Sequence, residues 1–553
     1  MNAHEEEKDE ERRPSGSGAS EAWLWRGHDH LSDSITAGGR IYRVAIMLTW
    51  ALVISWAVSS LWFPFGWDQG IMAWLGDTIL RGGMPYRDAF DIKGPAAHYI
   101  NALAQALFGH NLWGIRLLDL VGLTVSAWLL ADVVRRHTDR EAAPWAAAVF
   151  MLWFAGLTFW HTAQPDGWAS MLLCLGFVPL LRAGPQTKFR RDLWAGLMVG
   201  LTVLIKPNYA AFLAVPAVWY WSHRRHGISR IPGHMAVVAL SAAATVGLAL
   251  AWFAYRGALD ALIEVHILYN AQAYSSGSSL AVGERLRGVF EYVLTGNMAV
   301  IVLPVAAFGA VRLYGGHRPM FWSLLTWAAV AAAGVVLQNK FFDYQWAPLF
   351  PPIVILGAVG LHQALVAAPS FSNVPGGGRE NVDERTGPGL GHVLFCAILL
   401  HASIQPASEV VNWTSYMVGL RDKAAYYDTF GVPGPDYRMV DYIESIGGPE
   451  DRLFIMGWNI EILYMTGRET VSRLGYSLPV WMGEGTPLRE QYRAELMRDL
   501  TTRPPEMIVV APQAKRLLGE TVTLEDFFEF NEFLANQYDP EARFGGLELY
   551  VLR

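Results

Sequence analysis

The feature that most limits the fold of this chain is a succession of apolar runs, most of them about as long as a membrane-crossing helix. A helix needs roughly 17–25 mostly apolar residues to cross a bilayer. Only 17% of the 553 residues are charged and 52% are hydrophobic, whereas soluble proteins carry about 25% charged residues. The sequence therefore predicts a polytopic α-helical membrane protein with about eleven transmembrane helices. The runs lie at 44–63, 113–134, 144–160, 167–181, 193–206, 208–222, 235–255, 298–313, 320–338, 346–367 and 392–404.

The basic residues predict how the chain is oriented in the membrane. Clusters of Arg and Lys fall between alternate pairs of runs, and short loops rich in these residues stay in the cytoplasm. Arg40 and Arg43 place the N-terminus there too, behind an acidic segment (1–40) that is expected to be a disordered tail. The odd number of runs then places the C-terminus outside. We expect a multi-pass protein of the bacterial inner, or plasma, membrane with an extracytoplasmic C-terminus.

The chain divides into a membrane part and a tail of different composition. Residues 41–404 are the predicted transmembrane domain, with a first external loop at 64–112. Residues 405–553 are the predicted extracytoplasmic domain, of small α/β type, because strand-like and helix-like patterns alternate there. The expected strands lie at 452–457, 507–510 and 547–552, and the expected helices at 436–446, 488–502 and 524–537.

Asp68 is the first candidate for chemistry, because it directly follows the first apolar run. Placing a carboxylate beside hydrocarbon costs free energy, so an acid at this position suggests a functional site. As a general base, an ionised Asp68 would take the proton from an acceptor hydroxyl. The alternative is an Asp that ends a helix, lies in water and takes no part in chemistry.

The next candidates lie in the loop between Pro85 and Pro95. Asp88, Asp91 and Lys93 are closely spaced there between two residues that break helices. Such a loop can aim two acids and a cation at one small volume, and we expect these side chains to bind substrate. The alternative is a solvated loop with local ion pairs.

Other candidates lie where later runs end on the predicted outer side. Asp166 lies between two runs with almost no loop, and it is a second catalytic candidate or, alternatively, a helix N-cap. Lys206 and Lys340 end two further runs, with Tyr344 among the aromatic residues that follow Lys340. Such lysines can bind a lipid phosphate at headgroup depth, or they extend to water as interfacial lysines commonly do.

At these residues the chain resembles the GT-C superfamily of membrane glycosyltransferases. Within it, the chain is similar to bacterial relatives of protein mannosyltransferases and of the lipid A aminoarabinose transferase. The resemblance rests on Asp68 and on a set of short segments. They are Gly83–Pro95, Gln164–Asp166, Ile205–Pro207, Lys340–Pro352, Phe454–Trp458 and Leu463–Arg468.

The resemblance implies a sugar donor linked through phosphate to a polyprenyl lipid, and transfer to an acceptor on the external face. It implies that Asp68 is the base or acceptor anchor and that Asp166 is the second acid. Some members bind a divalent metal with acids of these loops, which makes Asp68 and Asp166 possible ligands. Gln69 and Gln164 stand where relatives often carry further acids, and fewer carboxylates weaken the case for a tightly held metal.

Three other functions remain open for this sequence. The chain could be a transporter or flippase of a lipid-linked sugar, although transporters usually place their polar sites near the middle of the membrane. It could be a polymerase or ligase of lipid-linked glycans, or a scaffold with the GT-C fold and no catalysis. The expected partners are the lipid-linked donor, a glycan, lipid or protein acceptor, and membrane lipids, with no nucleic acid among them.

Overall fold

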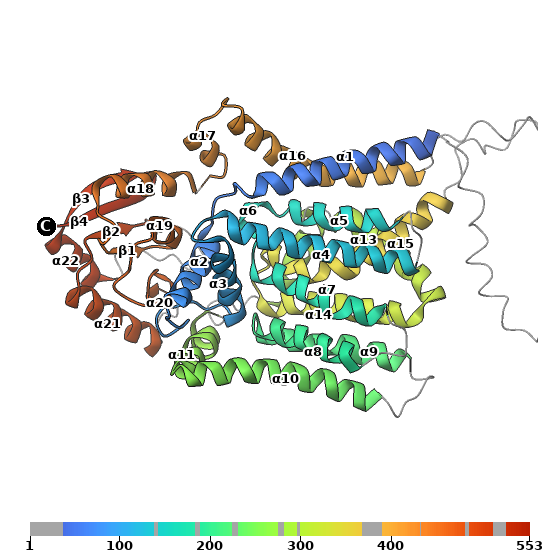
Figure 1. The fold of residues 1–553 in the computed structure, drawn as a ribbon, viewed down its shortest axis with the longest axis horizontal. Coiled ribbons are helices and arrows are strands. Elements are labelled where there is room, and N and C mark those ends of the chain that lie inside the picture. The colour runs from blue at the N-terminus through green and yellow to red at the C-terminus, as the bar shows by residue number, and fades with distance from the viewer. Residues whose placement is uncertain are drawn as a thin grey trace, which may run out of the picture.

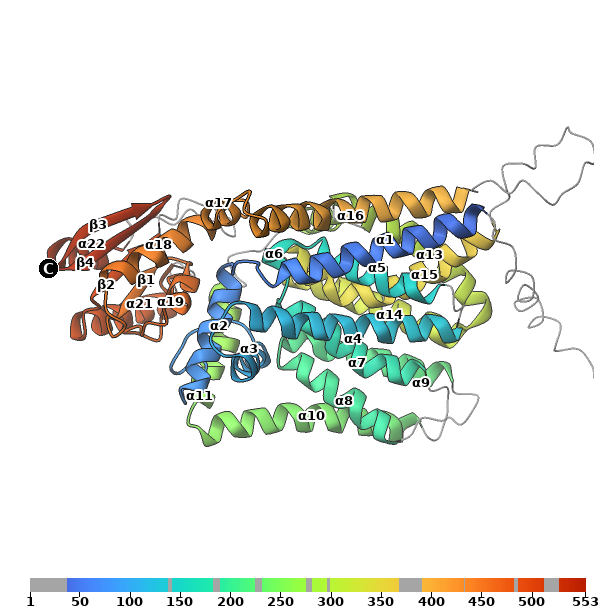
Figure 2. The same ribbon diagram turned by 45° about the horizontal axis from the view of Figure 1, so that its top comes forward.

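The computed structural model describes residues 37–137, 142–182, 189–223, 231–274, 281–295, 299–367, 390–431, 433–481, 486–511 and 527–553. Figure 1 shows long helices lying side by side along one axis, with a small sheet and its helices at one end of this bundle. Two short helices, α2 (Trp67–Leu80) and α3 (Pro95–Phe108), lie between the bundle and the sheet in both views (Figures 1 and 2). Most of the predicted acidic tail lies outside the described residues.

The bundle contains a helix for each apolar run of the sequence. These helices are α1 (Ala37–Ser60), α4 (Trp113–His137), α5 (Ala143–Ala155), α7 (Pro165–Leu181), α8 (Phe189–Val203), α9 (Ala214–Ser222), α10 (Ile231–Tyr255), α13 (Ala299–Gly316), α14 (Arg318–Gln338), α15 (Phe350–Ala367) and α16 (Leu390–Met417). Shorter helices join or flank them: α6 (Thr158–His161), η1 (Pro207–Leu213), α11 (Leu259–Leu262), η4 (Ile263–Tyr274), α12 (Val282–Thr295), η6 (Asp343–Leu349) and α17 (Lys423–Asp428).

The apolar helices support the prediction of a membrane protein. Within the described residues, 5 segments are long and apolar enough to cross a bilayer. They are Arg43–Ser60, Trp113–His137, Ile231–Tyr255, Arg318–Gln338 and Asp343–Leu361. Shorter apolar helices accompany them. The expected total of about eleven transmembrane helices and their orientation in the membrane stay predictions.

The C-terminal part folds around a four-stranded sheet in the order β1-β2-β4-β3. β1 (Leu453–Met456) pairs in parallel with β2 (Met507–Val510), while β4 (Leu547–Leu552) runs antiparallel to both β2 and β3 (Tyr538–Phe544). β1, β2 and β4 lie on the three segments expected to be strands. β3 was not expected, because Tyr538–Phe544 lacks an apolar stretch in the sequence, and in the structure this strand is mostly exposed.

Helices α18 (Pro433–Ile446), α19 (Ile460–Thr466), α20 (Leu478–Trp481), α21 (Pro487–Thr502) and α22 (Phe528–Gln537) accompany the sheet. The chain does not leave the bundle at residue 405, since α16 continues through Pro406 to Met417. The buried core of the C-terminal part extends directly into the loop helices. Trp74 and Leu75 of α2 and Tyr86 and Phe90 of the first loop belong to the same buried cluster as β1 and β2. The sheet is therefore packed onto the segment that carries the candidate residues.

Candidate active site

Asp68 lies in the first turn of α2 and forms an ion pair with Lys93. The Lys93 Nζ–Asp68 Oδ1 distance is 2.8 Å, and the two side chains are 13% and 33% exposed. A carboxylate in the first helical turn is stabilised by the helix dipole. Asp68 is therefore partly open to solvent and directly contacts a cation.

Lys93 also lies close to Asp91, which is fully buried. The Lys93 Nζ–Asp91 Oδ1 distance is 3.6 Å, and His98 Nε2 lies 2.9 Å from Asp91 Oδ2. The Tyr476 hydroxyl donates to Asp91 Oδ1 at 3.2 Å. Burial by itself would raise the pKa of Asp91, but Lys93, His98 and the Ile92 backbone N–H together lower that pKa to about 2. Asp91 is therefore a fixed negative charge beneath Lys93.

A second ion pair joins Asp166 and Lys206. Asp166 lies in the first turn of α7 directly after Pro165, a residue favoured at that helix position. Lys206 Nζ donates to both carboxylate oxygens at 2.7 and 2.8 Å and to Gln338 Oε1 at 2.5 Å. The Tyr209 hydroxyl also donates to Asp166, which is completely buried. The N-cap of α7 is Gln164, so Asp166 is not the cap that sequence reasoning offered as an alternative.

His161 and Tyr344 lie beside the Asp166–Lys206 pair. The His161 ring lies 5.7 Å from the Tyr344 ring, and Lys206 Nζ lies 5.9 Å from the same ring. Burial lowers the pKa of His161, and the charges of Asp343 and Asp68 partly oppose that shift. His161 was not among the candidates named from the sequence.

The backbones that carry the two lysines touch each other. A Cβ on Gly94 would lie 2.3 Å from the Leu204 carbonyl oxygen and 2.4 Å from the Ile205 carbonyl oxygen. The Ala96 N–H donates to the Leu204 carbonyl at 3.1 Å. Glycine is needed where two backbones approach this closely. The Lys93 loop and the end of α8 are therefore packed as one unit.

Gln69 ties α2 to the segment that precedes Asp166. Its Nε2 lies 2.9, 3.0 and 3.0 Å from the carbonyl oxygens of Phe159, Trp160 and Thr162. Its Oε1 accepts from the Gly66 N–H at 3.0 Å. An amide can both donate and accept, whereas an ionised Glu could only accept. The sequence showed only that Gln69 stands where relatives often carry an acid. Its tertiary contacts explain why an amide fits at this position.

Asp88 and Lys340 have different surroundings from the two ion pairs. Asp88 pairs with Arg87 at 2.7 Å and accepts from the Met84 N–H at 2.7 Å, contacts that stabilise its own loop. Lys340 is half-buried between Asn339 and Phe341, which have φ angles of 59° and 55°. Positive φ is uncommon for such residues and is often found at functional sites. The roles of Asp88 and Lys340 in substrate binding stay predictions.

The carboxylates do not fit a tightly held metal ion. Within the described part of the chain, no group of three or more His, Cys, Asp or Glu side chains is arranged to hold one. Asp68 and Asp166 instead each bind a lysine ammonium group. The positive charge beside Asp68 and Asp166 therefore comes from Lys93 and Lys206.

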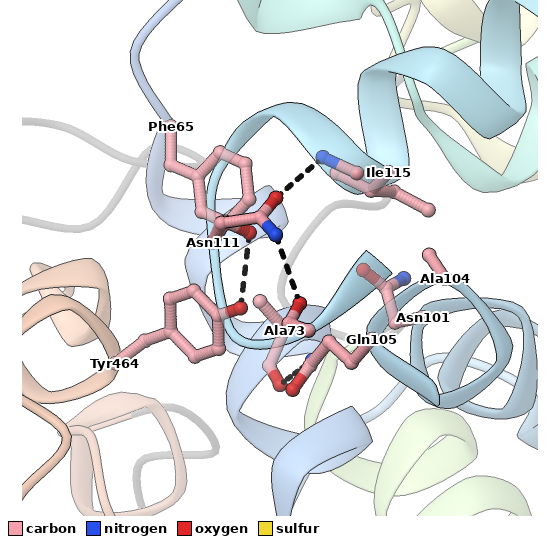
Figure 3. A pocket seen from close by; sticks show the side chains of 10 residues that line it. Phe65, Ala73, Asn101, Ala104, Gln105, Asn111, Ile115 and Tyr464 are labelled. Atoms are coloured by element: carbon pink, nitrogen blue, oxygen red, sulfur yellow. Dashed lines mark hydrogen bonds between the residues drawn. The ribbon is translucent and has the colours of Figure 1, made fainter. Parts of the chain in front are cut away.

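A small cavity lies beside α2, where α3, the start of α4 and Tyr464 meet (Figure 3). The Gln105 amide donates to the Ala73 carbonyl at 2.7 Å, and the Tyr464 hydroxyl donates to the Asn111 carbonyl at 3.1 Å. None of the residues that line this cavity is a candidate named above. The Gln105 contact joins α3 to α2, and the Tyr464 contact fastens α19 to the segment between α3 and α4.

Comparison with solved structures identifies the fold. The crystal structure of ArnT from Cupriavidus metallidurans bound to undecaprenyl phosphate matches with a TM-score of 0.56 and 14% identity, over 91% of this chain and 97% of that one. The apo structure of the same protein matches with a TM-score of 0.57 over the same shares of both chains, again at 14% identity. This chain has the GT-C glycosyltransferase fold.

A comparison of sequences agrees with the expected resemblance. The sequence model of the family described as dolichyl-phosphate-mannose-protein mannosyltransferase matches residues 92–252. The Archaeoglobus fulgidus oligosaccharyltransferase resembles this chain less, with a TM-score of 0.46 and 15% identity over 86% of this chain and 68% of that one. No curated protein sequence gives a significant match. The predicted resemblance to GT-C enzymes is thus confirmed.

Proposed function

We propose that this protein transfers a sugar from a polyprenyl-phosphate-linked donor to an acceptor hydroxyl at the external membrane surface. The observation that carries the proposal is the pair of lysine–carboxylate contacts, Lys93–Asp68 and Lys206–Asp166, on backbones that touch at Gly94. Two cations gathered at one end of a membrane bundle fit an anionic lipid phosphate. A carboxylate beside one of them fits a base for the acceptor.

The lysines stabilise the leaving group in this mechanism. As the bond between the anomeric carbon and the phosphate oxygen breaks, negative charge accumulates on the departing polyprenyl phosphate. Preorganised cations stabilise such developing charge more than they stabilise the bound donor. Asp166 is buried and bonded to Lys206, so it acts by holding that ammonium in place and not by contacting the acceptor.

Asp68 takes the proton of the acceptor hydroxyl while the acceptor oxygen forms its bond to the anomeric carbon. A phosphate that binds Lys93 competes with Asp68 for the ammonium group, because both anions attract the same cation. Donor binding therefore leaves the Asp68 charge less compensated at the moment when a base is needed. The proton passes from Asp68 to water after transfer, and polyprenyl phosphate leaves.

The test is transfer by the purified, full-length protein in lipid vesicles, with a panel of undecaprenyl-phosphate-linked sugars. We expect release of undecaprenyl phosphate, and Asp68→Asn should slow it by about 100-fold or more without lowering the melting temperature. Asp441→Asn is a matched control, because Asp441 is exposed and pairs with Lys423 at 3.3 Å. Movement of the intact donor across the vesicle membrane without its consumption would instead identify a transporter.

A further inference from the structure

Arg473 of the C-terminal part contacts three separate segments of the chain. Its Nη1 donates to the Tyr86 carbonyl at 2.9 Å, its Nη2 to Glu264 of η4 at 3.0 Å, and its Nε to Glu495 of α21 at 2.6 Å. Its own carbonyl accepts from the Phe90 N–H at 2.8 Å. The side chain is 15% exposed. Arg473 therefore bonds the first external loop from both its side chain and its backbone.

Tyr86 continues this connection to Lys93. The Tyr86 hydroxyl donates to the Lys93 carbonyl at 2.8 Å, and its N–H donates to the Ala89 carbonyl at 2.7 Å. Tyr86 is fully buried and has a φ of 70°, a conformation that a bulky residue adopts only when its surroundings impose it. Arg473 bonds directly to the carbonyl of this residue. Two hydrogen bonds thus link Arg473 to the backbone of Lys93.

The same loop is also held from its other side. His266 Nδ1 and Asn270 Nδ2 of η4 lie 3.0 and 2.8 Å from the Ile92 carbonyl oxygen. Arg473 bonds to Glu264 in that helix as well as to the loop. It is thus joined both to the loop and to the helix that supports the loop.

We propose that Arg473 is a positioning residue for sugar transfer, which acts through Tyr86 to hold the Lys93 ammonium beside Asp68. This inference rests on the proposed function and gives the C-terminal part a role in it. Arg473 does not contact the reacting atoms. When Arg473 is lost, Tyr86 can relax from its left-handed conformation and Lys93 moves with it. Binding of the phosphate is then weakened, because Lys93 is the proposed phosphate contact in this loop.

The experiment compares Arg473→Gln with Arg452→Gln in the full-length protein. Arg452 is a matched control, since it also forms an ion pair in the C-terminal part, with Glu506 at 2.7 Å, but does not bond to the loop. Three quantities are measured: hydrogen exchange of residues 85–94, affinity for undecaprenyl phosphate, and melting temperature. We expect Arg473→Gln to speed exchange in this loop and to weaken affinity by about tenfold, while Arg452→Gln changes neither.

A double variant tests whether the effect passes through Lys93. Lys93→Ala combined with Arg473→Gln should bind undecaprenyl phosphate no more weakly than Lys93→Ala alone, because residues acting in series are not additive. If Arg473→Gln does not fold, Tyr86→Phe tests the second bond of the connection, since it removes only the hydroxyl that reaches Lys93. Unchanged loop exchange and affinity in that variant would also overturn the positioning role. Arg473→Lys keeps the charge but not the planar fork, and it should restore affinity only in part.

The outcomes separate this inference from the proposed function. Unchanged loop exchange and unchanged affinity in Arg473→Gln, or additive losses in the double variant, would overturn the positioning role. A wild-type protein that transfers no sugar, but whose loop exchange and phosphate affinity still depend on Arg473, would reject the proposed function and leave the positioning of Lys93 supported.

Discussion

Replacing Gly94 by Ala tests whether the two lysine-bearing segments work as one unit. The new Cβ would lie 2.3 and 2.4 Å from two backbone carbonyl oxygens, at Leu204 and Ile205, where ordinary contact begins near 3.4 Å. Backbone atoms cannot rotate out of the way as a flexible side chain can. The Lys93 loop and the Lys206 segment must therefore separate by about 1 Å, a misplacement that can cost about 100-fold in rate.

The expected loss corresponds to about 2.7 kcal/mol of transition-state stabilisation. The strain should also lower folding stability, because overpacking a well-packed site costs about 1–3 kcal/mol. The assay is the rate of undecaprenyl phosphate release at saturating donor, together with the melting temperature of the same purified sample. We expect both to fall for Gly94→Ala.

Gly247→Ala provides the matched control. Gly247 lies in α10 with negative φ and with no atom within 4 Å of the added Cβ. Alanine is favoured over glycine in a helix, so this variant should melt no lower than the wild type and retain its rate. A Gly94→Ala protein with the rate and melting temperature of the wild type would refute the close packing of the two lysine segments.

Three further predictions follow from the structure. Asp166→Asn leaves Lys206 without its buried counter-charge, which costs about 3–5 kcal/mol when a buried pair is broken; we expect a lower melting temperature and slower transfer, and unchanged values of both would contradict the pairing. Burial raises the pKa of Asp436 to about 7 from 3.8, so its protonated form favours the folded C-terminal part at low pH and this stability is lost as pH rises toward 7. Melting followed between pH 4 and 7 should show that loss, and Asp436→Asn should reduce it; an identical slope in the variant counts against the raised pKa. A reporter that is active only outside the cytoplasm should be active when fused after Arg553, and a silent but expressed fusion would reject the predicted orientation.

The sequence by itself determined the membrane class and the positions of the helices. A membrane-crossing helix is marked by consecutive apolar residues, so each run could be recognised without knowing which helices pack against it. The helices of the structure lie on the predicted runs, and the resemblance to GT-C enzymes was visible in short motifs such as Gly83–Pro95. Local chemistry also picked out Asp68, Lys93, Asp166 and Lys206 as candidates.

Only the tertiary structure decided which of these residues meet. Asp166 and Lys206 are 40 residues apart in sequence, and Tyr476 and Asp91 are 385 residues apart. No periodicity in the chain encodes such contacts, because they depend on how whole helices and the C-terminal sheet pack together. For the same reason, the sequence could not predict the bond of Arg473 to Tyr86 or the contacts of Gln69 with three carbonyl oxygens. A charge pattern identifies residues able to do chemistry, whereas packing decides which of them share a site.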